Sequence, residues 1–255
     1  MGPGAKISAL IITYNEIEHL PACLESVSFA DEIIVVDAES TDGTWEFLRD
    51  RPGIKSIQHP FKNFTSQKSF ALQKAAHPWI LFIDADERIP DALKREIAET
   101  VNQPETCAAY YFYRQFIMKG KPLKYSGLQT DKVYRLFRKD AAYFNPGKIV
   151  HEDLVVTGTS GILKNKLLHY FYKDYDAYKY KMLRYGRLRG LEEYRKGIRP
   201  GWFHRYLKPL YKFLNHYIIR LGILDGKNGY IISYLNALSV YERYREVQRL
   251  RAGLK

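Results

Sequence analysis

The chain has 255 residues, of which 46% are hydrophobic and 27% charged, and its formal net charge is +12. It can bury one sizeable core, or one core and a smaller appendage, and its composition excludes a chain that is disordered throughout. The charge is uneven: residues 1–159 carry 19 Lys and Arg against 21 Asp and Glu, whereas residues 160–255 carry 21 against 7. This asymmetry indicates a catalytic part followed by a part that seeks an acidic surface.

The first hundred residues alternate between short apolar runs and segments of helical periodicity. The apolar runs predict strands over residues 7–12, 33–36, 54–57 and 79–83. Helices are expected over residues 18–26, around residues 45–48, and over residues 67–76 and 90–101. This alternation is typical of an α/β fold whose mostly parallel sheet has helices on both faces.

The pattern changes after residue 108. Strands are expected over residues 108–112, 133–137 and 161–168, the last leading to His169, and beyond Tyr172 only helices. The later part also holds 14 of the 21 tyrosines. We therefore expect a catalytic α/β domain over residues 1–172 and a basic, tyrosine-rich helical region over residues 173–255.

Polar or acidic residues follow three of the predicted strands directly. Ligands of open parallel sheets collect at the carboxyl ends of the strands, so these side chains are expected to converge although about 70 residues separate the first from the last. They are Thr13, Asn15, Glu16, Asp37, Asp84 and Asp86.

The Asp84-Ala85-Asp86 triplet predicts a metal site. Two carboxylates at a strand end can hold Mg²⁺ or Mn²⁺, which bridges the phosphates of a nucleotide diphosphate and offsets the charge of the departing group. The alternative is a solvated turn before the helix that Pro90 opens. The buried strand before the triplet and Asp37 at another strand end favour the metal site.

Three segments of the chain resemble the family-two glycosyltransferases of GT-A fold. They are ISALIITYNE at residues 7–16, IIVVDAESTDGT at residues 33–44 and WILFIDADE at residues 79–87. Further along, VYRLFR at residues 133–138, VHE at residues 150–152 and LDGKNG at residues 224–229 resemble the bacterial lipopolysaccharide-core β-glucosyltransferase subfamily. The resemblance implies a GT-A (Rossmann-like) fold and a nucleotide-sugar donor, with UDP as the expected nucleotide.

The resemblance also assigns roles to the strand-end residues. It implies that the first three, Thr13, Asn15 and Glu16, line the base and ribose pocket, and that Asp37 contacts the uracil or the ribose. Capping of the turn that follows is an alternative role for Asp37.

On the diphosphate side, the resemblance implies that Asp84 contacts the ribose or metal-bound groups and that Asp86 is the main metal ligand. It places Lys68, in the helix predicted over residues 67–76, near the diphosphate. A solvated helix lysine is the alternative for Lys68.

An inverting transfer of a hexose requires a base for the acceptor hydroxyl. The subfamily pattern favours Glu152 and the broader family pattern Asp153, while His151 is either a further metal or phosphate contact or an ordinary hydrogen-bonded histidine. The expected acceptor is a cell-envelope glycan or glycolipid such as lipopolysaccharide core. Residues 126–128 read Ser-Gly-Leu where relatives often have Gly-Gly-Trp, which leaves the acceptor sugar open.

The basic region has a four-residue repeat. His204, Lys208, Lys212, His216 and Arg220 would share one side of a helix whose other positions are mostly apolar. Such a helix fits an anionic membrane surface. The alternative is that its apolar side packs on the catalytic domain while its basic side is solvated.

The start of the chain lacks the apolar core of a signal peptide, and no apolar run approaches about 18 residues. The two cysteines, Cys23 and Cys107, form no zinc-type or CxxC spacing. We therefore expect a cytoplasmic protein, peripheral at the inner face of the cytoplasmic membrane.

Two other functions match parts of the sequence. A sugar nucleotidyltransferase should carry a glycine-rich loop after the first strand, where this chain reads Thr-Tyr-Asn-Glu. A nucleic-acid-binding protein would explain the positive charge but not the carboxylates at strand ends, so no nucleic-acid partner is expected.

Overall fold

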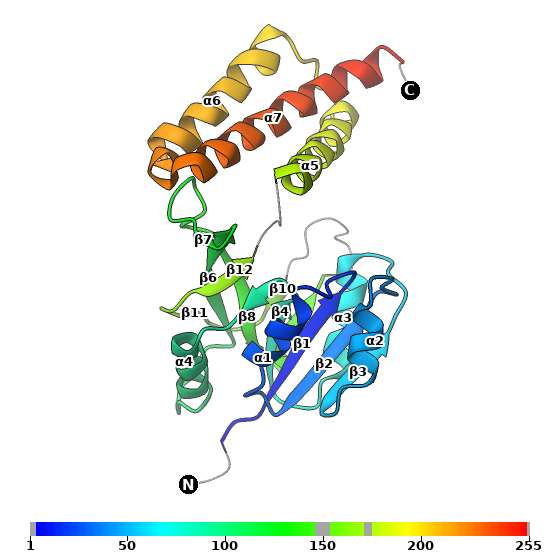
Figure 1. Ribbon diagram of the computed structural model, residues 1–255, viewed down its shortest axis with the longest axis vertical. Coiled ribbons are helices and arrows are strands. Elements are labelled where there is room, and N and C mark those ends of the chain that lie inside the picture. Colours follow the sequence, from blue (N-terminus) through cyan, green and yellow to red (C-terminus); the bar gives the residue numbers. More distant parts are fainter. Residues whose placement is uncertain (1–3, 146–153, 171–174, 254–255) are drawn as a thin grey trace. The chain divides into compact units, whose positions relative to one another are not determined.

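The computed structural model describes residues 4–145, 154–170 and 175–253, which divide into two compact units (Figure 1). The first unit takes residues up to 114 and residues 131–170; the second takes residues 115–130 and the chain after residue 170. The second unit thus begins near the boundary expected at residue 172, but it also includes a segment of sixteen residues that the sequence placed in the catalytic domain.

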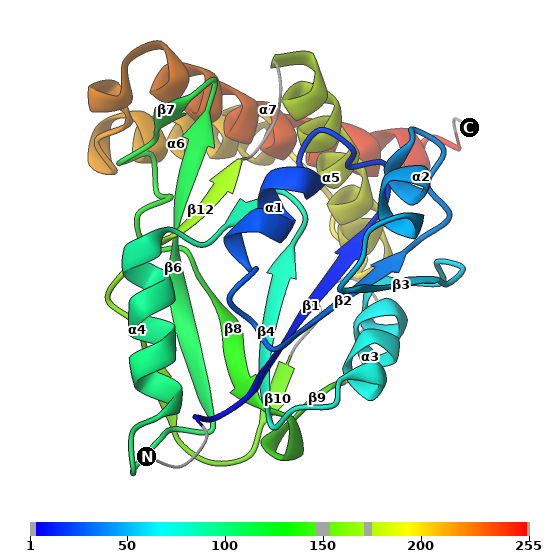
Figure 2. The ribbon, with the colours of Figure 1, turned by 60° about the horizontal axis from the view of Figure 1, so that its bottom comes forward.

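A mixed sheet forms the centre of the first unit (Figure 2). Four parallel strands come in the order β3, β2, β1, β4. Next to β4 lies β8, antiparallel to it, and next to β8 lies β6, antiparallel to β8. Their bounds are β1 Ile7–Thr13, β2 Glu32–Asp37, β3 Ile54–Gln58, β4 Trp79–Asp84, β6 Ala109–Met118 and β8 Lys132–Arg138. Thr13 lies opposite Asp37, and Ile12 opposite Asp84, so the three strand ends share one edge.

Short strands extend this sheet and form a second, two-stranded one. β5 (Glu87–Arg88) pairs antiparallel with β12 (Leu167–Tyr170), and β11 (Ser160–Ile162) runs parallel to β6. A 3₁₀ turn (Lys139–Ala141) leads into β9 (Ala142–Phe144), which pairs with β10 (Leu154–Val156).

Helices cover both faces of the sheet, as the sequence predicted. Because neighbouring residues of a strand point to opposite faces, Ile11 packs with α1 (Leu20–Ser26), α2 (Thr44–Arg49) and α4 (Asp91–Val101). Leu10 points the other way, to the side of α3 (Phe64–Lys74) and the β9–β10 pair. The predicted α/β fold class is confirmed.

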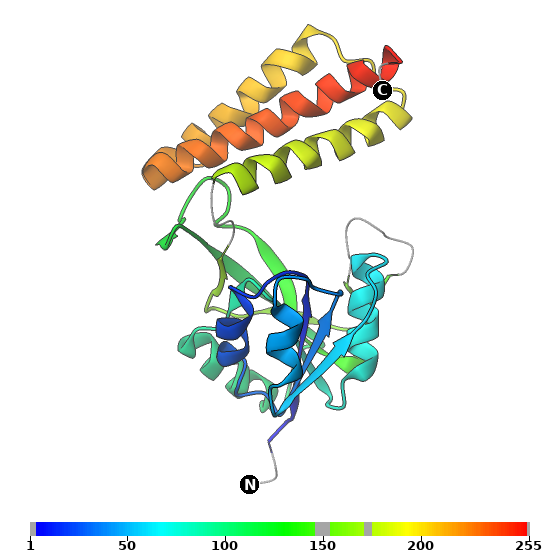
Figure 3. The same ribbon diagram turned by 45° about the vertical axis from the view of Figure 1, so that its right-hand side comes forward.

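Three helical segments form the second unit, and α7 lies between the other two (Figure 3). They are α5 (Tyr175–Arg195), α7 (Gly226–Arg251), and α6 (Lys208–Leu214) with π turns at Phe203–Leu207 and Asn215–Ile219. A 3₁₀ turn (Gly222–Asp225) precedes α7, and β7 (Lys121–Pro122) pairs with the end of β6. A Cβ at Gly186 of α5 would lie 2.6 Å from the carbonyl oxygen of Ser239, so glycine permits the close approach of α5 to α7.

Residues 115–130 join the second unit through Asp225. Its carboxylate accepts hydrogen bonds from the backbone N–H groups of Lys124 and Tyr125, both at 2.9 Å. The backbone N–H of Ser126 donates to the carbonyl of Arg220 at 3.0 Å. Asp225 belongs to the LDGKNG motif, so this motif anchors the loop that carries Ser126-Gly127-Leu128.

Two members of the basic repeat in residues 203–220, Lys208 and His216, are engaged inside the second unit, so the alternative of a solvated basic side does not hold for them. Lys208 Nζ donates to the hydroxyl of Tyr244 on α7 at 3.0 Å, and His216 is buried with Nδ1 at 2.8 Å from the carbonyl of Ser126. From residue 203 to residue 219 the exposed side chains are all apolar, and Arg220 after them is exposed as well. No helix in the described ranges is both long and apolar enough to cross a membrane.

Candidate active site

The loops after β1 and β2 are tied together at the shared strand edge. Asn15, whose φ of 55° is left-handed, accepts a hydrogen bond from the N–H of Thr41 through Oδ1 at 2.7 Å. Its own N–H donates to Ser40 Oγ at 2.8 Å, and the N–H of Glu16 donates to Thr44 Oγ1 at 3.0 Å. These contacts fix the places of Asn15 and Glu16 at the edge.

Asp37 is fully buried, and its carboxylate holds the turn that follows β2. It accepts hydrogen bonds from the N–H and the hydroxyl of Ser40 and, at 3.3 Å, from Gln58 Nε2. The capping role that the sequence left as an alternative is therefore present. Thr13, beside Asp37 in the sheet, has a buried hydroxyl with no hydrogen-bond partner among the described residues.

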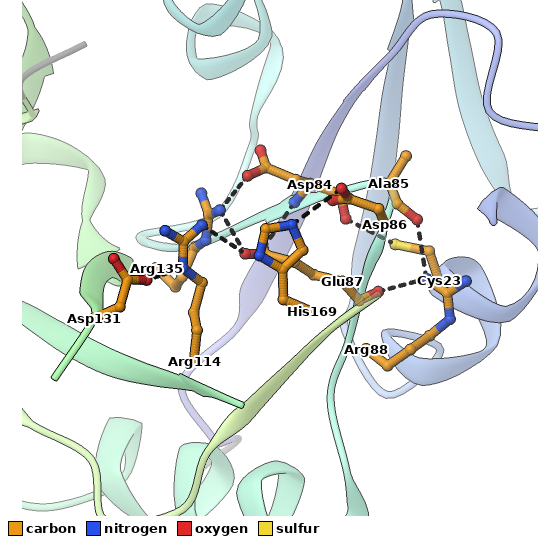
Figure 4. A network of polar contacts seen from close by, with 10 residues as sticks. All are labelled: Cys23, Asp84, Ala85, Asp86, Glu87, Arg88, Arg114, Asp131, Arg135 and His169. Carbon is orange, nitrogen blue, oxygen red and sulfur yellow. Dashed lines mark hydrogen bonds and ion pairs between the residues drawn. The ribbon is translucent and has the colours of Figure 1, made fainter. Parts of the chain in front are cut away.

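Asp84 ends β4 and is ion-paired with Arg135, a buried residue of β8 (Figure 4). Arg135 Nη2 also donates to Glu87 Oε1 at 2.7 Å, and Glu87 Oε2 accepts the N–H of Asp84 at 3.1 Å. Burial by itself would raise the pKa of Asp84, but the positive charges of Arg135 and Lys68 outweigh it and hold this pKa well below its usual range. Asp84 is therefore ionised at neutral pH.

Asp86 lies two residues further on, with a side chain that is 31% exposed. His169 Nε2 is 3.0 Å from Asp86 Oδ2, and the N–H of Tyr170 donates to the carbonyl of Asp86 at 2.8 Å. Pairing of β12 with β5 brings His169 here. Sequence reasoning placed this histidine only at a strand end and gave it no role; its position directly after an apolar strand was the available signal.

Arg88 fixes the turn that carries both aspartates. Its guanidinium donates to the carbonyls of Ala85 and Glu87 at 2.9 and 2.7 Å, and to the carbonyl of His19. Arg114, on β6, adds an ion pair with Asp131 and lies 3.7 Å from Glu87 (Figure 4). The triplet is thus held by the buried Arg135 and the half-buried Arg88 and is not a loose solvated turn.

The side chains at this edge could hold a divalent cation only if a bound ligand supplied further coordinating atoms. No three His, Cys, Asp or Glu side chains of the described residues are grouped so as to hold a metal by themselves. Asp86 offers an oxygen and His169 a nitrogen, while Asp84 is engaged with Arg135. Mg²⁺ is commonly bound by one or two carboxylates together with substrate phosphates, and this arrangement fits that mode.

A cavity of about 760 Å³ opens beside Asp84. Lys68 and Arg135 are among its lining residues, and so are Tyr111 and Tyr134, whose rings stack with centroids 3.6 Å apart. Lys68 is buried, with Nζ 5.1 Å from the centroid of the Phe82 ring, so the alternative of a solvated helix lysine is wrong. The cavity therefore offers cations, which phosphates contact, and aromatic faces, which sugar rings contact.

Three predicted site residues, His151, Glu152 and Asp153, lie outside the described residues. Their roles stay predictions.

Comparison with known proteins gives the family. The model described as glycosyl transferase family 2 matches residues 8–156. In sequence the chain is similar to the lipopolysaccharide core biosynthesis glycosyltransferase LpsC of Rhizobium meliloti (strain 1021), with 27% identity over 256 residues that cover 96% of this chain and 95% of LpsC.

Two solved structures show the same fold. One is S. aureus TarS 1–349 in complex with UDP-GlcNAc, with a TM-score of 0.50, 16% identity, and coverage of 97% of this chain and 92% of that one. The other is the mannosyltransferase PcManGT from Pyrobaculum calidifontis in complex with GDP-Man and Mn²⁺, with a TM-score of 0.50, 16% identity, and coverage of 100% and 77%. The chain belongs to glycosyl transferase family 2 and has the GT-A fold that its sequence predicted.

Proposed function

We propose that the chain is a metal-dependent, inverting glycosyltransferase that moves a hexose from a UDP-linked donor to a cell-envelope glycan or glycolipid such as lipopolysaccharide core. The observation that carries the proposal is the pairing of Asp86 with His169 at the edge where three strands end. LpsC matches nearly the whole chain, and its description as a lipopolysaccharide core biosynthesis glycosyltransferase supports the choice of acceptor.

The nucleoside would bind over the tied loops after β1 and β2. The buried hydroxyl of Thr13 has no hydrogen-bond partner among the described residues, so a ligand could bond to it. Asn15 and Glu16 lie at the same edge. Asp37 would reach the uracil or ribose while it also holds its own turn. TarS, of the same fold, binds UDP-GlcNAc, which supports this position for the donor.

The diphosphate would lie between Asp86, His169 and Lys68. Asp86 and His169 would hold Mg²⁺ or Mn²⁺ together with phosphate oxygens, and PcManGT, of the same fold, has Mn²⁺ with its GDP-Man. A metal bound there offsets the charge that builds on the departing diphosphate. The ammonium group of Lys68, close to Asp84, adds positive charge on the same side, and Asp84 would contact the ribose or metal-bound groups.

Inversion needs a base on the face of the sugar opposite the diphosphate. A carboxylate there removes the proton of the acceptor hydroxyl while the hydroxyl oxygen attacks the anomeric carbon and the carbon–oxygen bond to the diphosphate breaks. We assign this role to Glu152, with Asp153 as the alternative, and propose His151 as a further metal or phosphate contact.

An enzyme that acts on the proposed acceptor would work at a membrane. We propose that it is cytoplasmic and peripheral at the inner face of the cytoplasmic membrane. The excess of Lys and Arg in residues 160–255 supports attraction to anionic lipid.

A donor-hydrolysis screen tests the proposal. Purified chain is incubated with a panel of UDP- and GDP-sugars, with and without Mn²⁺, and release of the nucleoside diphosphate is measured. We expect release from one UDP-hexose, at least tenfold faster with Mn²⁺ than with EDTA. Release that is equally fast in EDTA would refute the metal dependence, and preference for a GDP-sugar would refute the donor.

A further inference from the structure

The second unit has a large apolar surface. Every exposed side chain from residue 202 to residue 219 is aliphatic or aromatic. We call these side chains the apolar face; they include Trp202 at 67% exposure, Leu210 at 51%, Tyr211 at 65% and Ile218 at 56%. Soluble proteins seldom leave so many neighbouring apolar side chains in water without a use for them.

Two cationic side chains of the same segment, Arg205 and Lys208, face inward, onto α7. Arg205 donates to the hydroxyl of Tyr241 and to Gln248 Oε1, at 3.2 and 3.1 Å, and Lys208 donates to Tyr244. A surface helix of a soluble protein does the reverse, with its apolar stripe on the core and its charges in water. The segment is therefore built to keep its apolar face outward.

The π turns on both sides of α6 help to make this arrangement possible. Residues four apart drift around an α-helix, because its turn holds 3.6 residues. A π turn, with its i→i+5 hydrogen bonds, is wider and reduces that drift. The four-residue repeat of His204, Lys208, Lys212 and His216 can therefore stay on the α7 side, which leaves the apolar face continuous.

The charges around the face identify what covers it. Between Glu193 and Asp225 the chain has no acidic residue, and four of its seven Lys and Arg are exposed, namely Arg195, Lys196, Arg199 and Arg220. Arg220 and Lys227, just beyond the face, are exposed. An apolar stripe among cations matches a lipid surface that has acyl chains below and phosphates above, and Trp and Tyr prefer that interface. A second copy of the chain would instead bring two cationic regions together.

We propose that the apolar face inserts into the surface of an anionic bilayer, with the surrounding arginines and lysines at the lipid phosphates. This inference rests on the proposed membrane-borne acceptor and names the surface that meets the membrane. It replaces the sequence-based idea that the basic side of this helix makes the contact, because Lys208 is engaged with Tyr244.

Tryptophan fluorescence tests the insertion directly. Of the three tryptophans, Trp202 is exposed, whereas Trp79 is buried and Trp45 half-buried. Full-length protein is mixed with phosphatidylcholine vesicles that contain 0 or about 40% phosphatidylglycerol, with dibrominated acyl chains as quencher. We expect quenching that requires the anionic lipid and is lost in Trp202→Phe. Unquenched emission, or quenching unchanged in Trp202→Phe, would overturn the proposal.

Matched triple variants test the face. Leu210→Ser, Tyr211→Ser and Ile218→Ser are combined in one protein, and Leu188→Ser, Tyr180→Ser and Tyr185→Ser, at exposed positions of α5, in the control. We expect the first triple to bind vesicles at least tenfold more weakly and the control to stay within about twofold of wild type. Equal loss in both, or loss in neither, contradicts the proposal. So does a wild-type dimer that the first triple converts to monomers in light scattering.

Donor hydrolysis without vesicles separates this inference from the proposed function. None of the six substituted side chains has a part in the proposed chemistry, so both triples should hydrolyse the donor at the wild-type rate. A wild-type protein that is quenched by the vesicles but hydrolyses no donor would remove the proposed function and leave the membrane face. A wild-type protein that hydrolyses the donor but is not quenched by the vesicles would remove the membrane face and leave the proposed function.

Discussion

His169 Nε2 lies 3.0 Å from Asp86 Oδ2, although 83 positions separate the two residues in the chain. The contact exists because β12 pairs antiparallel with β5, the strand that starts directly after Asp86. The N–H of Tyr170 holds the backbone of Asp86 from the same strand. A nitrogen and an oxygen donor thus stand together beside the strand edge, in the part of the fold where the donor diphosphate is proposed to bind.

Asp86→Asn and His169→Gln are expected to weaken activation by Mn²⁺. Asp86→Asn should abolish metal-dependent donor hydrolysis, because it removes the charged ligand, and should change the free energy of unfolding by less than about 1 kcal/mol, since the side chain is partly exposed. His169→Gln should raise the Mn²⁺ concentration for half-maximal hydrolysis at least tenfold. Titration of hydrolysis against Mn²⁺ measures both effects.

His77→Gln, elsewhere in the first unit, is the control for the histidine substitution and should behave as wild type. Calorimetric titration with UDP in the presence and absence of Mn²⁺ gives a second readout. Full Mn²⁺ activation in Asp86→Asn would remove the metal assignment.

Arg135→Met should destabilise the first unit by about 3 kcal/mol. Arg135 is buried between Asp84 and Glu87, and its loss leaves the fully buried Glu87 without its nearest cation, a situation that typically costs several kcal/mol. Arg138→Met, three residues along the chain, removes an exposed pair with Asp140 and a contact at 6.0 Å with the centroid of the Trp79 ring, and it should cost less than about 1 kcal/mol. Urea unfolding of the two variants measures the difference, and equal costs would contradict the role given to Arg135.

The sequence predicted the strand edge well and the partners of its carboxylates poorly. Apolar runs mark buried strands, and the polar residues directly after them must lie at the edge, so Asp37, Asp84 and Asp86 were found without structure. Arg135 and His169 reach the site through pairing of β4 with β8 and of β5 with β12. Such pairings join distant segments, and no local pattern in the chain specifies them.

The helical segment over residues 203–220 shows a second limit. A repeat of four predicts which residues share a side, but not which side is packed. Cations are rarely buried, so both arrangements considered from the sequence kept the basic side outward, either at an anionic membrane surface or in water. Here hydrogen bonds to Tyr244, Tyr241 and the carbonyl of Ser126 compensate for its burial, and the apolar side is exposed instead.

His216 should make the stability of the second unit depend on pH. Burial, aided by the charge of Lys212, lowers the pKa of His216 to about 4, against an ordinary value of 6.5. Below pH 6.5 the unfolded chain therefore binds a proton that the folded chain does not. This contribution to the free energy of unfolding is complete above pH 6.5, falls as the pH decreases toward 4, and then levels off; the loss is roughly 3 kcal/mol at most.

Urea unfolding of wild type and His216→Gln between pH 8 and pH 4 checks this expectation. The difference in stability between the two proteins isolates His216 from other titrating groups. It should favour wild type most at pH 8 and shrink steadily below about pH 6.5. A difference that is constant over the whole range would show that this histidine does not titrate as proposed.

The choice of base predicts opposite outcomes for two neighbouring residues. Glu152→Gln should reduce transfer to a saccharide acceptor by at least about a hundredfold, the usual scale for loss of a general base, because glutamine cannot accept the proton of the hydroxyl. Donor affinity, measured by calorimetry with UDP, should barely change, since this group acts on the acceptor.

Asp153→Asn, an equally small change one residue away, is the matched control and should keep most of the activity. A crippled Asp153→Asn beside a normal Glu152→Gln would reverse the assignment and make Asp153 the base, whereas equal effects on UDP affinity would place both carboxylates at the donor.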